Sequence, residues 1–174
     1  GDGAFGGCTG LTSITIPSSV TSIGDSAFRG CSGLTSITIP ESVTSIGSGI
    51  LGNCSVLTSI VVAEGNVKYN SGNGANCIIE TATNTLIAGC KNTVIPEGVT
   101  SIGERAFYYC TGLKSITIPS SVTSIGERAF YYCSGLSSII LPNNLEKIGS
   151  EAFDYSGFYA SATSGDLIYL SNYD

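Results

Sequence analysis

The sequence predicts a solenoid of stacked, β-rich coils, because a unit of 23 residues repeats along most of the chain. Residues 17–24 (Pro-Ser-Ser-Val-Thr-Ser-Ile-Gly) return 23 positions later at Pro40, and further copies begin at Pro96, Pro119 and Pro142. Cysteines and Ala-Phe pairs keep the same step, and eight of the 23 positions are regularly apolar. One unit alone cannot bury this apolar face, so neighbouring coils must cover it.

Each unit opens with a predicted strand, in which Leu34, Ile37 and Ile39 are separated by polar residues. Alternation and β-branched residues are typical of a half-buried strand. Pro40 ends this strand, because proline cannot donate a hydrogen bond to a ladder. Residues 43–46 predict a second short strand, and a glycine closes it.

The third part of the unit, represented by residues 25–28, predicts a single helical turn with Asp25 as its cap. The apolar positions of all units point inward if the coils stack about 4.8 Å apart, which is the usual separation of paired strands. Each coil is therefore expected to have three sides, formed by two strands and one turn.

The cysteines of the repeat predict a column of small buried side chains, an environment in which free cysteine is common. Ser156 takes this position in the last unit, which fits a packing role. A metal site or a disulfide is the alternative, although parallel side chains in adjacent coils disfavour disulfide geometry. Cys77 and Cys90 lie on opposite sides of an irregular unit and are the pair to check for a bridge. We expect both to be reduced.

Over nearly its whole length the chain resembles the BspA-like class of leucine-rich repeats, found in surface proteins of anaerobic bacteria and some protozoa. The residues that carry the resemblance are Leu34-x-x-Ile37-x-Ile39-Pro40-x-x-Val43-x-x-Ile46-Gly47 and Ala27-Phe28-x-x-Cys31. The resemblance implies a leucine-rich-repeat right-handed solenoid, with parallel strands on the concave face and short strands and single helical turns elsewhere. Family members are implicated in adhesion to host proteins and other microbes, which implies a cell-surface or extracellular location.

One coil, at about residues 57–89, is expanded. The step from Leu57 to the equivalent Cys90 is 33 instead of 23, so this coil holds ten extra residues. Residues 64–75 are polar and rich in Gly and Asn, which indicates an exposed loop. Residues 77–88 predict a β-hairpin. Insertions in solenoids often lie at the binding face, and the alternative is a structural coil with no ligand role.

We expect residues 1–174 to form a single solenoid that is truncated at its N-terminus, because residues 1–8 match only the last part of a unit. The repeat fades after Ser156. Solenoids need polar capping units for solubility. The stretch after Ser156 is therefore expected to be an imperfect cap, with residues 167–170 as a closing strand.

Composition argues against several classes of function. The net charge of −6, with seven Lys and Arg residues, argues against nucleic-acid and anionic-membrane partners. The apolar runs fall far short of the roughly 20 residues needed to cross a bilayer, so no membrane insertion is expected. Histidine, a phosphate-binding loop and a Cys-x-x-Cys motif are all missing from the sequence. We expect no catalytic residue, cofactor or metal, and hence no enzyme.

Two surfaces are candidate binding sites. The end of the unit carries two neighbouring columns of tyrosine, a residue that is favoured in interfaces. Outward positions of the first strand carry hydroxyl groups that can bind protein or sugar. The predicted residues are Tyr108, Tyr109, Tyr131, Tyr132 and Tyr155 for the first surface, and Thr12, Thr15, Thr35, Thr38, Lys114 and Thr117 for the second.

Each surface also has a plain structural explanation. The rings could cover the junctions between coils, and the hydroxyls could solvate an exposed sheet. Regular threonines also occur on ice-binding surfaces, but Val61, Val94 and Ile140 interrupt the threonine column here. The leading prediction is a noncatalytic adhesion or protein-recognition module that binds a host or microbial surface protein. A carbohydrate-binding module with a glycan partner, and a structural spacer for another domain, are the alternatives.

Overall fold

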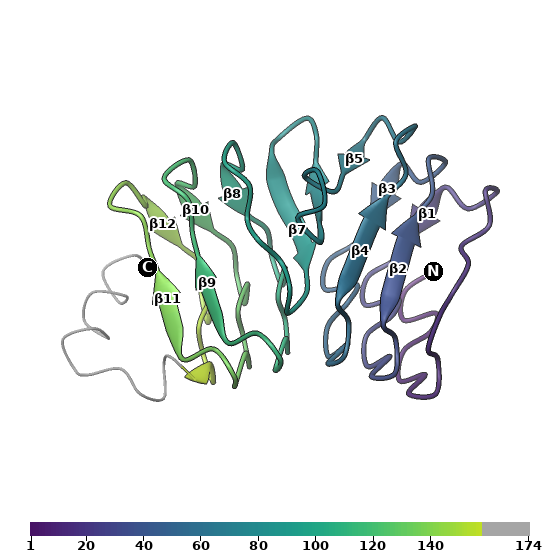
Figure 1. Ribbon diagram of the computed structural model, residues 1–174, viewed down its shortest axis with the longest axis horizontal. Coiled ribbons are helices and arrows are strands. Elements are labelled where there is room, and N and C mark those ends of the chain that lie inside the picture. The colour runs from purple at the N-terminus through teal and green to yellow at the C-terminus, as the bar shows by residue number, and fades with distance from the viewer. Residues whose placement is uncertain (158–174) are drawn as a thin grey trace.

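The computed structural model describes residues 1–157, whose coils stack along one axis with the N-terminus at one end (Figure 1). Short strands joined by turns make up each coil, which confirms the predicted solenoid. The strands of this part of the chain are β1 (Ser22–Ile23), β2 (Ser36–Ile39), β3 (Ser45–Ile46), β4 (Ser59–Val62), β5 (Tyr69–Asn70), β6 (Cys77–Glu80), β7 (Thr85–Gly89), β8 (Ser101–Ile102), β9 (Ser115–Thr117), β10 (Ser124–Ile125), β11 (Ser138–Ile140) and β12 (Lys147–Ile148). The expected cap, with its closing strand at 167–170, lies outside the described residues.

The first strands of the units lie on one side of the solenoid, which we call the strand face (Figure 1). β2 pairs with β4 and β9 pairs with β11, both in parallel and in the 23-residue register that the repeat predicts. Along β2, Ile37 and Ile39 are buried while Ser36 and Thr38 are exposed, as expected for a half-buried strand. Residues 93–95, the equivalents in the expanded region, form no regular strand, so the face holds two strand pairs.

The second strands of the units form another side. β1 pairs with β3, and β8, β10 and β12 form a parallel ladder in the same register. The isoleucine of each of these ladder strands is buried at Ile102, Ile125 and Ile148. β7 extends the ladder by pairing in parallel with β8.

The third side consists of turns, and it differs in detail from the expected helical turn. The amide of Arg29 donates to the carbonyl of Ser26 at 2.9 Å, as in a helical turn. Ser26, however, has a φ of 54°, a left-handed conformation that a right-handed helix does not contain. The Asp25 carboxylate accepts a hydrogen bond from the amide of Ser48 in the next coil at 2.9 Å, instead of capping its own turn.

The hairpin of the expanded coil is confirmed, because β6 and β7 pair in antiparallel fashion with a bulge in the middle. It separates two apolar clusters. Its residues Cys77, Ile79 and Leu86 pack with the C-terminal coils. Ile78 and Ala88 pack instead with the N-terminal coils. Side chains alternate between faces along β6, and the bulge places Leu86 and Ala88 of β7 on opposite faces, so one thin hairpin contributes to both cores.

The prediction of an exposed loop at residues 64–75 was only partly right. Asn66 and Tyr69 are buried, and β5 pairs with β6. The Asn66 amide nitrogen donates to the carbonyl oxygens of Pro40 at 2.8 Å and Val43 at 3.0 Å. Its side-chain oxygen accepts from the amides of Lys68 and Tyr69, both at 2.9 Å. A polar side chain is stable in a core when its hydrogen bonds are satisfied in this way.

The cysteine column is buried as predicted at Cys31, Cys54 and Cys133, whereas Cys8 in the first coil is exposed and Cys110 is partly buried. All seven cysteines lie within the described residues and are free thiols, including Cys77 and Cys90. The thiols of Cys31, Cys54 and Cys133 are buried and donate to a phenylalanine carbonyl oxygen of a preceding coil. The three distances, to Phe5, Phe28 and Phe107, are 3.2, 3.2 and 3.0 Å. Each thiol therefore ties the turn of one coil to the turn of its neighbour.

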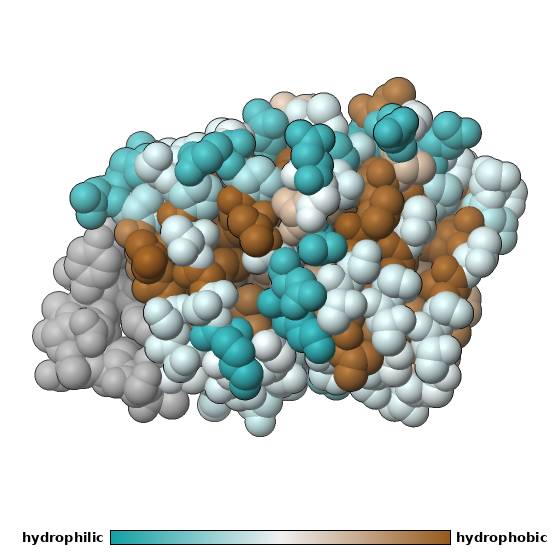
Figure 2. Space-filling model, viewed as in Figure 1, coloured by the Kyte–Doolittle hydropathy of each residue, from teal (hydrophilic) through white to brown (hydrophobic). Residues whose placement is uncertain are grey.

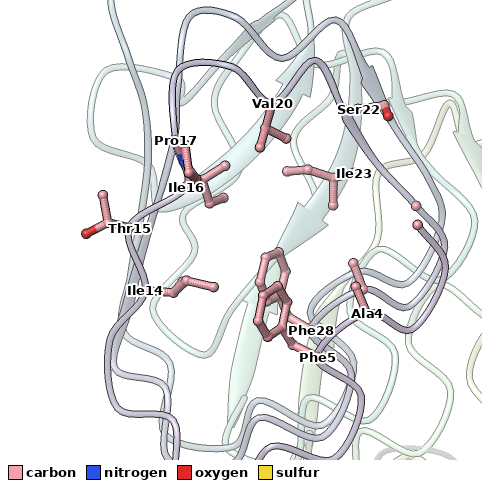
Figure 3. A pocket seen from close by; sticks show the side chains of 13 residues that line it. Ala4, Phe5, Ile14, Thr15, Ile16, Pro17, Val20, Ser22, Ile23 and Phe28 are labelled. Carbon is pink, nitrogen blue, oxygen red and sulfur yellow. The ribbon is translucent and has the colours of Figure 1, made fainter.

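Phenylalanine rings form a second ladder beside the thiols. Phe130 is fully buried and stacks between Phe107 and Phe153, with ring centroids 4.9 and 5.3 Å away. In the first coil, Phe5 stacks on Phe28 at 5.4 Å but is 39% exposed. Figure 3 shows the apolar side chains of this coil pointing into a hollow of about 270 Å³, which is the core viewed from its end.

Candidate functional site

The turn side of the C-terminal coils holds the predicted tyrosines in register. The amide of Phe107 donates to the Ala129 carbonyl at 2.7 Å, and the amide of Tyr109 donates to Tyr131 at 2.8 Å. The next coil repeats the pattern, because the amide of Tyr132 donates to Asp154 at 2.8 Å. Alternate residues of each turn are thus bonded to the following turn. This ladder places equivalent tyrosines directly beside one another.

The expanded coil contributes no turn to this side. The turn at residues 48–54 therefore lies directly against the turn at 104–110, although 56 positions separate them in the sequence. The amide of Asn53 donates to the Tyr108 carbonyl at 3.2 Å. The Arg105 guanidinium donates to the Ser48 hydroxyl at 3.3 Å. The tyrosine columns of the C-terminal half consequently continue into the N-terminal half.

The five tyrosines form one stacked surface, which we call the tyrosine edge (Tyr108, Tyr109, Tyr131, Tyr132 and Tyr155). Tyr109 and Tyr132 stack with centroids 4.5 Å apart, and Tyr108 and Tyr131 stack at 5.4 Å. Tyr155 meets Tyr131 edge-on at 5.3 Å. Exposure rises along the outer column to 40% at Tyr132 and 61% at Tyr155. The predicted columns therefore exist and reach the solvent.

The outer column of the edge has an unusual backbone. Tyr109, Tyr132 and Tyr155 each have a φ of 56°. This left-handed conformation crowds the Cβ atom of any residue except glycine, and Asn tolerates it better than most. The equivalent residues of the N-terminal coils are Gly7, Gly30 and Asn53, all at positive φ. The C-terminal coils therefore place bulky rings where the same chain elsewhere uses the residues that suit the backbone.

Charged groups border the tyrosine edge. The guanidinium carbon of Arg29 lies 5.4 Å from the ring centroid of Tyr108 and 5.9 Å from that of Tyr109. Arg128 makes a two-pronged contact to Glu151, with nitrogen–oxygen distances of 2.9 and 2.7 Å. This hydrogen-bonded ion pair lowers the pKa of the Glu151 carboxyl from its ordinary value. Arg128 also pairs with Glu127 at 3.4 Å, so its charge is offset on both sides.

The strand face also presents its predicted residues to solvent. Those residues, all exposed, are Thr12, Thr15, Thr35, Thr38, Lys114 and Thr117. Not every hydroxyl is available as a donor, because Thr35 bonds the carbonyl of Thr12 at 3.3 Å. The column of Thr15 and Thr38 also contains exposed Val61, Val94 and Ile140. Figure 2 accordingly shows hydrophobic islands among weakly polar residues, without a continuous apolar patch.

Sequence reasoning missed Arg29 as part of the tyrosine edge. The repeat places Arg29 in the column of Tyr108, but the expanded coil lies between the two residues in the sequence. The repeat does not specify on which side the ten extra residues leave the stack, so it gives no signal for this contact. Among residues 1–157, no group of three or more His, Cys, Asp or Glu side chains is arranged to hold a metal ion. No helix in this part of the chain has the length and apolarity required to span a bilayer.

Comparison with known proteins agrees with this architecture. The profile of the BspA type leucine rich repeat region matches six copies across residues 1–87 and 86–173. The chain belongs to the BspA-type leucine-rich-repeat family. None of the curated protein sequences compared with it matches significantly.

Solved structures similar to this BspA-type chain come from bacteria. A leucine rich cell surface protein of Faecalibacterium prausnitzii is 32% identical with a TM-score of 0.72, and the match covers 88% of this chain and 41% of that one. The pneumococcal vaccine antigen PcpA is 26% identical with a TM-score of 0.64, over 74% of this chain and 32% of that one. A leucine-rich repeat protein of Eubacterium ventriosum is 27% identical with a TM-score of 0.57, over 84% and 52%.

These matches have two consequences. The chain spans about two fifths of the first similar structure and about a third of the second. The family and its structures support a repeat protein-interaction module as the general character of the chain. They do not identify which surface binds.

Proposed function

We propose that the chain is a noncatalytic recognition module of a cell-surface or extracellular protein, and that it binds a host or microbial surface protein through its tyrosine edge. The similarity to a leucine rich cell surface protein supports the location. The stacked, partly exposed rings support the binding surface. Tyrosine suits such a role because its ring buries a large area while its hydroxyl remains free to bond.

The left-handed backbone of Tyr109, Tyr132 and Tyr155 is the observation that carries this proposal. An L-residue in this conformation costs on the order of 1–2 kcal/mol, which glycine avoids. Stacking of the rings stabilises each pair by about 0.5–1.5 kcal/mol and so offsets part of this backbone cost. The rings of Tyr132 and Tyr155 are 40% and 61% exposed, so their burial is incomplete. Within residues 1–157, left-handed positions recur in each turn of this side, as at Ser26, Arg105 and Arg128, but only the outer column fills them with aromatic rings, and strained residues cluster at functional sites.

A glycan partner is the second candidate. The edges and faces of exposed tyrosines can stack on sugar rings, and the hydroxyl groups of the strand face can bond sugar hydroxyls. The third reading is a spacer that holds another domain away from the cell. A spacer would bind nothing, and substitutions on either surface would leave it unaffected. The three readings therefore differ in what the isolated domain captures.

Binding of the domain to immobilised host matrix proteins and to a glycan array tests the proposal. The test variant is Tyr109→Asn/Tyr132→Asn, which places Asn in the left-handed positions as the chain itself does at Asn53. Thr15→Asn/Thr38→Asn on the strand face is the matched control. We expect biolayer interferometry to show saturable protein binding that the tyrosine variant weakens about thirtyfold, since an interface hot spot contributes about 2 kcal/mol or more.

Each other outcome would change the assignment. Equal affinity of parent and tyrosine variant, together with loss in the threonine control, would transfer the site to the strand face. Binding only to glycans would favour the carbohydrate module. If the parent bound neither panel, the spacer reading would replace the proposal.

A further inference from the structure

A shallow trough adjoins the tyrosine edge on the turn side of the N-terminal coils. Its volume is about 390 Å³, and its lining is Gly3, Gly6, Gly7, Ser26, Gly30 and Asn53, together with Arg29. Glycine leaves the floor of the trough without Cβ atoms at Gly3, Gly6, Gly7 and Gly30. The trough exists because the columns that carry Tyr108 and Tyr109 carry glycine at Gly6 and Gly7.

Arg29 is the charged side chain of this trough, and it lies between the glycine floor and the tyrosine rings. Cation–π contacts to Tyr108 and Tyr109 hold its guanidinium in place. The two other arginines of this side are neutralised, Arg105 by Glu104 at 2.8 Å and Arg128 by two glutamates. Among residues 1–157, no carboxylate lies within ion-pairing distance of Arg29. The planar guanidinium of Arg29 is therefore positioned by the tyrosine rings, while its N–H donors form no ion pair with a carboxylate in this part of the chain.

We propose that the trough receives an extended acidic segment of the partner protein, with an Asp or Glu side chain of that segment on the Arg29 guanidinium. This inference rests on the proposed function, because it specifies the chemistry of that partner. Charge complementarity selects the carboxylate, since a fixed guanidinium binds carboxylates through paired N–H donors. The glycine floor selects the extended chain, because a floor without Cβ atoms allows close approach of a second backbone.

The lining favours a peptide over a sugar. A pyranose ring has several hydroxyl groups that each need a polar partner when buried. The trough offers only two uncharged polar side chains, Ser26 and Asn53, while the rest of its uncharged lining is glycine. An extended peptide in a shallow trough can keep its backbone N–H and C=O groups hydrated on the open side, and its acidic side chain finds Arg29. Its neighbouring side chains would reach the rings of Tyr108 and Tyr109.

The test uses the whole chain as bait for a displayed library of random linear peptides. Selection is performed in parallel on the parent, on Arg29→Gln and on Lys68→Gln. Lys68 is exposed and lies in the expanded coil, so its substitution makes the same change of net charge at a distance from the trough. We expect the parent and Lys68→Gln to enrich peptides that contain Asp or Glu. We expect Arg29→Gln to bind the same peptides about tenfold more weakly, as for a lost charge-assisted hydrogen bond.

Arg29→Lys separates the guanidinium fork from simple charge, because lysine keeps the cation without the planar donors. It should recover only part of the affinity. Enriched peptides without acidic residues, or full affinity in Arg29→Gln, would overturn the inference while leaving the proposed function intact if the tyrosine variant still lost binding. Enrichment of no peptide by the parent would overturn the inference as well. Capture of protein partners on the matrix panel would then show whether the proposed function survives alone.

Discussion

At the scale of single residues, the thiols illustrate how burial sets chemistry. Burial raises the pKa of Cys54, Cys77 and Cys110 to about 12, from an ordinary value of 9.0. Neighbouring thiols raise these pKa values further, Cys31 for Cys54 and Cys90 for both Cys77 and Cys110. Only a thiolate is an efficient nucleophile, so these cysteines are inert at neutral pH. Cys8, in contrast, is exposed.

Alkylation of the folded chain with iodoacetamide at mildly alkaline pH should therefore label Cys8 and spare the other six cysteines. Mass spectrometry of proteolytic fragments identifies the labelled sites, and a sample unfolded in guanidinium chloride supplies full labelling as the control. Labelling of Cys54 or Cys77 as fast as Cys8 in the folded chain would contradict the buried column.

The same pKa shifts make the stability of the fold depend on pH. Below about pH 9 the buried thiols are protonated in both the folded and the unfolded chain, so their stabilising effect is fully present. Between about pH 9 and pH 12 the thiols of the unfolded chain lose their protons, while the buried thiols of the folded chain keep theirs. Deprotonation lowers the free energy of the unfolded chain relative to the folded chain. The free energy of unfolding should consequently fall across this range.

At the scale of elements, the expanded coil departs most from the repeat. The period of 23 predicts both strand columns and the tyrosine columns, because identical units stacked in register place equivalent residues side by side. The local pattern of two apolar runs around a polar turn predicts the hairpin, although the period breaks there. The period could not predict that the turn at 48–54 lies against the turn at 104–110. The side on which ten extra residues leave the stack depends on packing that no local pattern encodes.

The buried environment of Asn66 belongs to this same unpredicted part. Its column carries Val in neighbouring units, as at Val43, so polarity alone indicated an exposed loop. Two of its four hydrogen bonds instead connect the expanded coil to Pro40 and Val43 of the coil before it, and the other two hold the local turn at Lys68 and Tyr69. The side-chain amide of Asn66 therefore supplies hydrogen bonds between coils at the point where the expanded coil departs from the repeat.

Asn66→Val, although it restores the residue of the repeat, should destabilise the chain. It would leave the amides of Lys68 and Tyr69 and the carbonyl groups of Pro40 and Val43 without this partner. An unsatisfied buried group costs about 1–3 kcal/mol, so we expect a loss of at least about 2 kcal/mol. Urea unfolding of Asn66→Val beside the parent measures this loss. Equal or higher stability of the variant would show that the hydrogen bonds of Asn66 contribute nothing.

At the scale of the whole molecule, the fold depends on buried residues, while the proposed site consists of residues at the surface. Stability comes from ladders of Ile, Phe and Cys that bury contiguous apolar surface between coils. The strand face and turn side are largely polar or aromatic exteriors, and changes there leave the ladders untouched. At the outer column of the tyrosine edge, aromatic residues adopt a left-handed backbone although the rings of Tyr132 and Tyr155 remain partly exposed. This contrast is the central claim of the account.

The most direct test of that claim is the free energy of unfolding of Tyr109→Asn/Tyr132→Asn, measured with urea beside the parent. Relief of the left-handed strain at two positions, about 1–2 kcal/mol each, should balance the lost ring stacking. We therefore predict stability within about 1 kcal/mol of the parent, or higher. A loss of about 2 kcal/mol or more would contradict the account, because the tyrosines would then be present for the fold and not for a partner.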